Sequence, residues 1–156
     1  MSTISTAETS VRLRSFAQGG SWLHLGELRR FAVLEHTLAI ADLPQELEGF
    51  RILHISDLHM GTRWQRGYDR LIELVEQMAV DVICCTGDIV DDKITHIPAM
   101  PNVMQLLPAL KGRLGFFTVL GNHDNLHLGH DVAGLGITVL NGARCEINTD
   151  DAPIEL

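Results

Sequence analysis

The chain has 156 residues, of which 46% are hydrophobic and 21% charged, a composition typical of a globular protein with one sizeable core. Its formal net charge of −8 argues against a nucleic-acid-binding surface, which usually presents a basic face. No apolar run in the sequence approaches the length of a membrane span.

The three cysteines, Cys84, Cys85 and Cys145, are odd in number, and two of them are adjacent in an apolar run. This usage is typical of reduced, buried thiols in a cytosolic protein. We therefore expect a cytoplasmic location, and we keep peripheral association with a membrane open as an alternative.

Residues 1–30 are expected to form a flexible N-terminal segment that is irregular up to Gly19-Gly20, with a short helix capped by Ser21. An organellar presequence is the less favoured reading of its Ser-, Thr- and Ala-rich start. Residues 31–40 favour a strand, and residues 31–156 are expected to form the folded domain.

An alternation of strands and helices follows. Residues 51–56, 82–86 and 114–120 are apolar runs closed by turn residues, which predicts buried strands. Residues 67–80 carry apolar side chains at helical spacing, and residues 98–110 predict a second helix that Pro108 shortens. The βαβαβ order predicts an α/β fold with a mostly parallel sheet.

The last third of the chain predicts a helix over residues 125–133 and a strand over residues 137–140. Asn141-Gly142 is the dipeptide most typical of a two-residue hairpin, so we expect residues 143–147 to return as a paired strand.

Each of the three buried strands ends in a polar cluster, and in parallel sheets ligands bind beyond the carboxyl ends of the strands. The clusters are Asp57-Leu58-His59, Gly87-Asp88-Ile89-Val90-Asp91 and Gly121-Asn122-His123-Asp124. Carboxylate oxygen together with imidazole nitrogen suits Mn, Fe, Zn or Ni. We therefore expect a metal site at this edge of the sheet.

In order, spacing and strand context, the three clusters resemble the signature of the calcineurin-like metallophosphoesterases. The wording Asp-Leu-His-Met-Gly and Thr-Gly-Asp-Ile-Val-Asp resembles the bacterial YkuE-type branch. The resemblance implies that this chain forms the first half of a two-sheet sandwich. It also implies a hydrolase that acts on phosphoester bonds through a two-metal site, where both the attacking and the leaving oxygen are stabilised.

The same resemblance implies roles for five residues of the three clusters. It makes Asp57 and His59 ligands of the first metal, Asp88 the bridging ligand and Asn122 a ligand of the second metal. It makes His123 the catalytic histidine that serves the leaving oxygen. We expect Asp124 to orient its imidazole.

The chain departs from the family pattern after these clusters. The family completes its site with further downstream histidines, whereas none follows His130 here, and His127 and His130 lie too close to His123 to replace them. The chain therefore carries four of the seven usual ligands. We expect a C-terminally incomplete domain that hydrolyses phosphodiesters poorly by itself. Such a domain would expose apolar surface, and we leave two alternatives open: the N-terminal segment covers this surface, or the molecule self-associates through it.

Two other readings stay open. A non-catalytic metal-binding or scaffolding module with the same fold would explain the missing histidines. A Mg²⁺ phosphotransfer site formed by Asp57, Asp88 and Asp91 on a Rossmann-like sheet is less consistent with the histidines, because Mg²⁺ prefers oxygen ligands.

Overall fold

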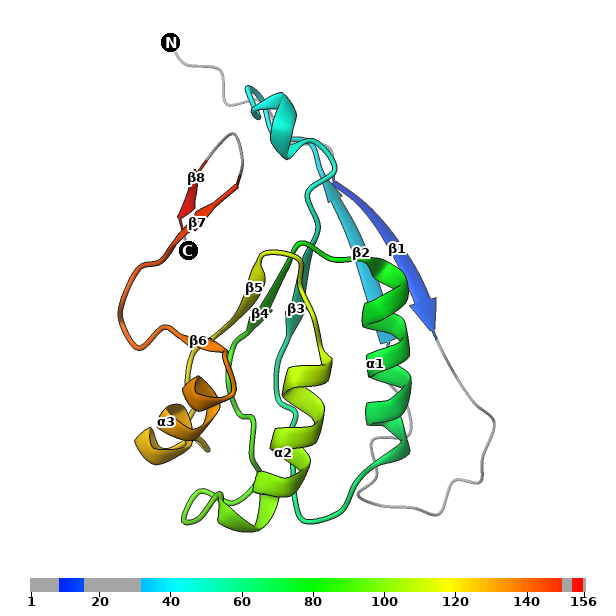
Figure 1. Ribbon diagram of the computed structural model, residues 1–156. Helices are drawn as coiled ribbons and strands as arrows, with labels where there is room; N and C mark the ends of the chain where they lie inside the picture. The colour runs from blue at the N-terminus through cyan, green and yellow to red at the C-terminus, as the bar shows by residue number, and fades with distance from the viewer. Residues whose placement is uncertain (1–8, 16–31, 150–152, 156) are drawn as a thin grey trace.

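The computed structural model describes residues 9–15, 32–149 and 153–155, and its centre is a four-stranded parallel sheet (Figure 1). The strand order is β3-β4-β5-β6, with β3 (Ile52–Ile55), β4 (Val82–Cys85), β5 (Gly115–Thr118) and β6 (Thr138–Val139). The helices between them are α1 (Arg66–Met78), α2 (Met100–Leu106) and α3 (Leu126–Gly134). Short 3₁₀ turns span Gln45–Leu47, Ile97–Ala99 and Leu107–Ala109. The predicted parallel α/β fold is confirmed.

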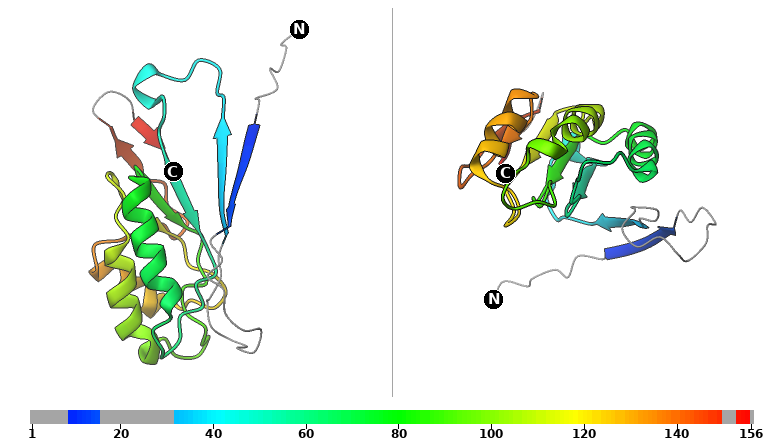
Figure 2. Two further views of the ribbon diagram at one scale, coloured as in Figure 1. Left: turned by 90° about the vertical axis from the view of Figure 1, so that its right-hand side faces the viewer. Right: turned by 90° about the horizontal axis from the view of Figure 1, so that it is seen from below.

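The two faces of the sheet contribute to different hydrophobic clusters because side chains alternate along a strand. Ile83 and Phe116 join the large core beneath α1 and α2, while Val82 and Phe117 face the other way. The second cluster is closed by Ile147, which is 5% exposed. Figure 2 shows α1 and α2 on one side of the sheet and the β1–β2 ribbon on the opposite side.

The helix boundaries follow the sequence signals. α1 buries Tyr68, Leu74 and Val75 along one side and ends where Ala79 takes a left-handed conformation. α2 ends at Leu106, and the 3₁₀ turn that continues it contains Pro108, which has no amide proton for a helical hydrogen bond. The expected early end of this helix is confirmed.

The N-terminal prediction fails over β1 (Thr9–Ser15), which pairs antiparallel with β2 (Ala32–Leu38) and is not irregular. The free edge of β2 offers hydrogen-bond partners to the backbone N–H and C=O groups of β1. The amino-acid composition of the segment does not reveal such a partner. The short helix expected after Ser21 lies outside the described residues.

The predicted hairpin at Asn141-Gly142 is wrong. β7 (Glu146–Asn148) pairs with β8 (Pro153–Glu155) instead of returning along β6. β6 has only two residues, both paired with β5, so it offers little for a return strand to bind. Burial of Ile147 against the open face of the sheet favours the observed path by roughly 2 kcal/mol.

The three cysteines are unpaired, and Cys85 is buried whereas Cys84 and Cys145 are half-buried. Burial raises the pKa of the Cys84 and Cys85 thiols, so both favour the protonated, unreactive form. The cytoplasmic location inferred from cysteine usage stays a prediction.

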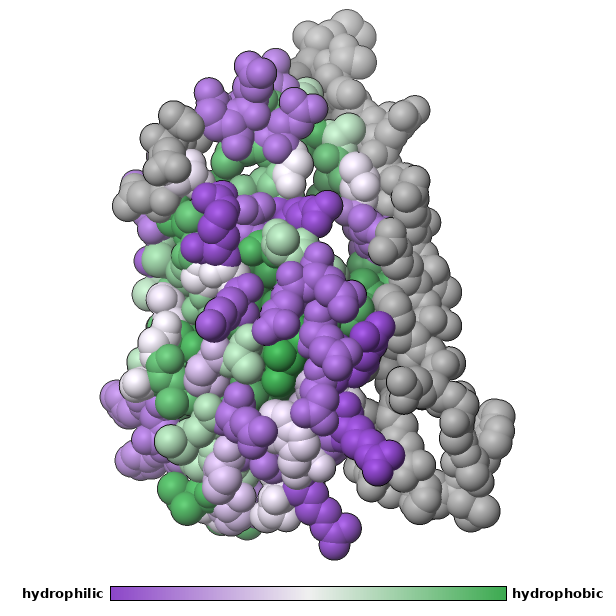
Figure 3. Space-filling view, turned by 45° about the vertical axis from the view of Figure 1, so that its right-hand side comes forward, coloured by the Kyte–Doolittle hydropathy of each residue, from purple (hydrophilic) through white to green (hydrophobic). Residues whose placement is uncertain are grey.

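Among the described residues, no helix has both the length and the apolar character needed to cross a membrane. Several large apolar side chains are nevertheless exposed, including Leu34, Leu38 and Ile52 at 56%, 60% and 57%. On the face shown in Figure 3, hydrophobic and hydrophilic residues are interspersed. Self-association through such surface stays a prediction.

Asp81 joins the amino ends of β3, β4 and β5. Its Oδ2 accepts a 2.8 Å hydrogen bond from the Arg51 amide, and its Oδ1 accepts a 2.7 Å bond from Arg113 Nε. Burial opposes ionisation of this carboxyl, but the hydrogen bonds and charges of the two arginines outweigh it and lower its pKa.

We expect Asp81→Ala to lower the free energy of unfolding by about 2 kcal/mol at pH 7, because charged hydrogen bonds are lost. Since the pKa is lower in the folded chain, this stabilisation is complete above about pH 4 and disappears as the pH falls through the folded-state pKa. Urea unfolding at pH 7 and pH 3 measures both effects. Glu155→Ala, which removes an exposed ion pair with Arg144, is the control and should change stability little. An equal loss in both variants would contradict the prediction.

Candidate metal centre

The loops that follow β3 and β4 continue side by side beyond the sheet. The amide of Asp57 donates to the carbonyl of Gly87 at 3.1 Å, and the amide of His59 donates to the carbonyl of Asp88 at 3.0 Å. A parallel bridge between Met60 and Val90 follows. The hydrogen bonds of the two strands thus extend into the loops, and this extension fixes two of the three polar clusters against each other.

The backbone is strained at the predicted ligands. Asp57, His59 and Asp88 have positive φ angles of 55°, 41° and 53°. A left-handed conformation costs a residue with a side chain about 1–3 kcal/mol, and such strain concentrates at functional sites. The surrounding hydrogen bonds therefore hold these side chains in positions that the local sequence alone would not favour.

The third loop, which follows β5, crosses the second at two glycines. A Cβ atom on Gly87 would lie 2.2 Å from the amide nitrogen of Gly121, and one on Gly121 would lie 2.3 Å from Asp88 Oδ1. Only glycine allows the two backbones to approach this closely. The crossing brings the amide of His123 within 2.8 Å of Asp88 Oδ1, to which it donates.

Three side chains converge where the loops meet. One ligand atom from each of His59, Asp88 and His123 lies within 4.8 Å of the other two. The two imidazoles pack edge to face, with ring centroids 4.6 Å apart. His59 Nδ1 is buried and has no hydrogen-bond partner among the described residues. A buried imidazole nitrogen that makes no hydrogen bond and lies 3.6 Å from Asp91 Oδ1 fits a divalent cation that accepts nitrogen and oxygen ligands.

The remaining predicted ligands lie around this group. Asp57 Oδ1 is 3.6 Å from His59 Nε2, and the Asp57 side chain is 63% exposed. The side-chain amide of Asn122 is 3.2 Å from Asp88 Oδ2. The fold thus places all four predicted ligands and His123 at one edge of the sheet, while their individual roles stay predictions.

The orientation of the His123 ring depends on a residue that the sequence did not single out for this purpose. His123 Nδ1 lies 2.7 Å from the backbone carbonyl of Asp91. A carbonyl only accepts, so Nδ1 donates to it, and Nε2 is the ring nitrogen that remains for other partners. The motif Gly-Asp-Ile-Val-Asp located Asp91, but a carbonyl contact has no residue-type signal.

Asp124, the predicted partner of that ring, contacts backbone amides instead. Its Oδ1 accepts from the amides of Ile89 and Val90 at 2.9 and 3.2 Å, and its Oδ2 accepts from the amide of Gly121 at 3.0 Å. Asp124 therefore joins the second and third loops, which corrects the expected mode of action.

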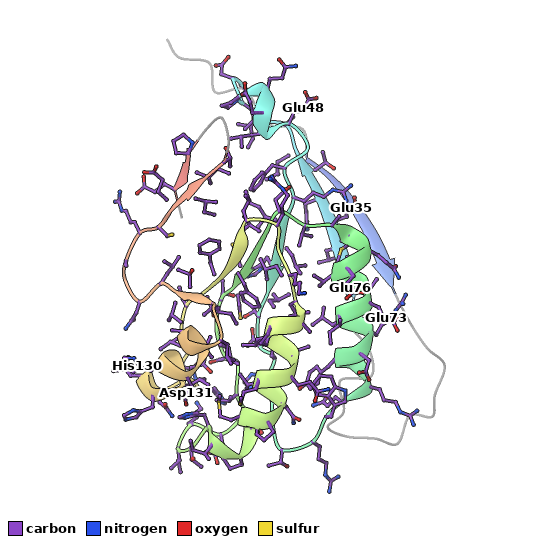
Figure 4. All side chains as sticks on the ribbon, in the orientation of Figure 1. Glu35, Glu48, Glu73, Glu76, His130 and Asp131 are labelled. Carbon is purple, nitrogen blue, oxygen red and sulfur yellow. The ribbon has the colours of Figure 1, made fainter. Side chains whose placement is uncertain are left out.

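The other histidines of the described residues lie outside the converging group. His96 is 4% exposed and its Nε2 is 2.8 Å from Asp131 Oδ2, so it joins the 91–99 segment to α3. His127 and His130 are exposed, and Figure 4 shows His130 and Asp131 on α3. As surface residues, His127 and His130 do not join the converging group.

A sequence model of the family described as calcineurin-like phosphoesterase matches residues 50–151, the part of the chain that contains all three loops. The chain belongs to this family. It is 31% identical over 134 residues to an uncharacterized metallophosphoesterase of Aquifex aeolicus, which covers 83% of the chain. It is 31% identical over 92 residues, 58% of the chain, to the uncharacterized metallophosphoesterase YkuE of Bacillus subtilis.

A further relative is a transmembrane protein with a metallophosphoesterase domain from Danio rerio, 27% identical over 123 residues, or 74% of this chain. The matched regions cover 49%, 32% and 27% of the Aquifex, Bacillus and Danio proteins, so the chain spans at most about half the length of these relatives. The resemblance to YkuE-type phosphoesterases is confirmed at the level of the family.

Proposed function

We propose that this chain carries the amino-terminal part of a metal-dependent phosphoesterase centre that uses two divalent ions. The observation that supports the proposal most directly is the convergence of His59, Asp88 and His123 within 4.8 Å. Membership of the calcineurin-like phosphoesterase family supports the reaction class. The ions, when bound, would supply Lewis acidity toward the phosphoryl group.

We assign the ligands of the two ions to different residues of the chain. We assign Asp57 and His59 to one ion, Asp88 to a position shared by both ions, and Asn122 to the other ion through its amide oxygen. The hydrogen bonds between the loops after β3 and β4 hold these side chains in place, so ion binding requires little rearrangement of the protein. Hydrolysis by this chain alone is expected to be slow, because the second ion has few protein ligands among the described residues.

His123 is the proton-transfer residue in this proposal. Its Nδ1 is held by the carbonyl of Asp91, so Nε2 is the nitrogen that exchanges a proton with the leaving oxygen. The crossing of the second and third loops at Gly87 and Gly121 fixes the position of His123 relative to Asp88. Because the proposal puts His123 in contact with the leaving oxygen, we assign it as catalytic.

Calorimetric titration with Mn²⁺ tests the proposal. We expect the chain to bind Mn²⁺ and Asp88→Ala to weaken binding by more than ~100-fold, beyond the 10–100-fold typical of losing a residue that only supports a ligand. Glu73→Ala is the matched control, since Glu73 lies on α1 away from the three loops and should leave binding unchanged (Figure 4).

Absence of Mn²⁺ binding, or equal binding by Asp88→Ala, would refute the metal centre. Turnover of bis(p-nitrophenyl) phosphate, measured on the same samples, distinguishes an enzyme from a non-catalytic metal-binding module. Slow, Mn²⁺-dependent hydrolysis that requires His123 supports the enzyme. Mn²⁺ binding with no hydrolysis supports the non-catalytic module.

A further inference from the structure

Lys93 places an ammonium group beside one of the proposed ligands. Its Nζ lies 3.0 Å from the side-chain amide of Asn122, whose other end is 3.2 Å from Asp88 Oδ2. The loop that presents Lys93 is a turn in which Asp92 Oδ1 accepts from the amides of Ile94 and Thr95 at 2.8 and 3.3 Å. The proposed function gives Lys93 no part.

The Asn122 amide can adopt two orientations between these neighbours. With its oxygen toward Lys93, the amide accepts from Nζ and donates to Asp88 Oδ2, which satisfies both contacts. With its oxygen toward Asp88, two acceptor oxygens stand 3.2 Å apart and two donor nitrogens stand 3.0 Å apart. The second arrangement is favourable only when a cation binds between the two oxygens.

The amide has a single oxygen, so it cannot serve Lys93 and such a cation at once. An ammonium group near a divalent ion also repels it, in addition to competing for the ligand. Lys93 is exposed, so its flexible side chain can move into solvent when an ion arrives.

We propose that Lys93 is a competitor built into the site, which occupies the Asn122 amide oxygen and is displaced when the second divalent ion binds between Asp88 and Asn122. This inference rests on the proposed function. It predicts that the two ions bind with unequal affinity, the ion on the Asn122 side being weaker because it must displace the ammonium.

The experiment is a calorimetric Mn²⁺ titration of the full chain and of Lys93→Met. We expect the variant to bind the second Mn²⁺ about ten-fold more tightly, in line with the loss of one partly screened charge, and the first with unchanged affinity. Electron paramagnetic resonance gives an independent readout, because paired Mn²⁺ ions should form at lower Mn²⁺ concentration in the variant. Lys93→Arg keeps the charge and should behave like the parent chain.

Two further variants exclude other causes of a gain. Lys111→Met removes a positive charge after α2, outside the three loops, and should leave both binding events unchanged. In an Asn122→Ala background, Lys93→Met should give a clearly smaller gain, since only the repulsion by the ammonium group remains and the competition for the Asn122 oxygen is lost. A gain of the same size with and without Asn122 would overturn the inference and assign the whole effect to charge.

The failures of the inference and of the proposed function are distinct. Asp88-dependent Mn²⁺ binding that is identical in the parent chain and Lys93→Met overturns the inference and leaves the metal centre intact. No Mn²⁺ binding by either protein overturns both. Circular dichroism confirms folding, and Lys93→Gln replaces the methionine variant if that variant fails to fold.

Discussion

Gly87→Ala should lower the free energy of unfolding by about 3–5 kcal/mol and abolish Mn²⁺ binding. Gly87 has a φ of +96°, a conformation that residues with side chains rarely adopt. An added Cβ would also meet the nitrogen and Cα of Gly121 at 2.2 and 2.7 Å. The nearest atoms are backbone, so relief requires the second and third loops to separate.

Urea unfolding and Mn²⁺ calorimetry measure the two effects. The matched control is Gly134→Ala in α3, where an added Cβ would meet nothing within 4 Å. Alanine is the better helix former there, so this variant should keep or slightly raise stability. If the free energy of unfolding of Gly87→Ala were within about 1 kcal/mol of that of the parent chain, the prediction would be wrong. The close contact of the two loops would then not determine the position of Asp88.

The Gly87 prediction depends on a feature of the site that the sequence alone could not predict. Glycine, aspartate and histidine after each apolar run located the three loops, because strand ends and turn residues are local signals. The order of the clusters on successive strands then predicted their convergence, and the parallel sheet confirmed it. The distance between two loops at Gly87 and Gly121 is a property of the fold, and no local signal encodes it.

The incorrect predictions have a common physical origin. Asn141-Gly142 favours a tight turn locally, but the burial of Ile147 against Phe117 decided where the following strand went. Thr9–Ser15 forms a strand because β2 offers a partner edge, a contact that spans the intervening segment of the sequence. Tertiary pairing outweighs local preference in both places.

The residues within the site show the same limit. Residue type and order singled out the three polar loops, and the family resemblance then picked out candidate residues within them. Lys93 was missed because its contact with Asn122 depends on the turn formed by Asp92. Asp91 was located by its motif, but its carbonyl contact with His123 was not.

Asp124→Ala should cost about 3 kcal/mol of stability, because three backbone amides lose their shared acceptor. These amides belong to Ile89 and Val90 on the second loop and to Gly121 on the third. Asp124→Asn should cost less, since its oxygen still accepts from one loop while its amino group opposes the N–H of the other. Urea unfolding measures the series, and Glu76→Ala on the exposed side of α1 is the control.

The same series decides how Asp124 acts. If Asp124 oriented the His123 ring, Asp124→Ala would slow hydrolysis while stability and Mn²⁺ affinity stayed at the level of the Glu76→Ala control. The hydrogen bonds predict a different result: Asp124→Ala lowers both the free energy of unfolding and the Mn²⁺ affinity. The affinity falls because Asp88 lies on the loop that Asp124 holds in place. A carboxylate that follows a catalytic histidine in the sequence would then position the second loop, and through it Asp88, while the Asp91 carbonyl orients the imidazole.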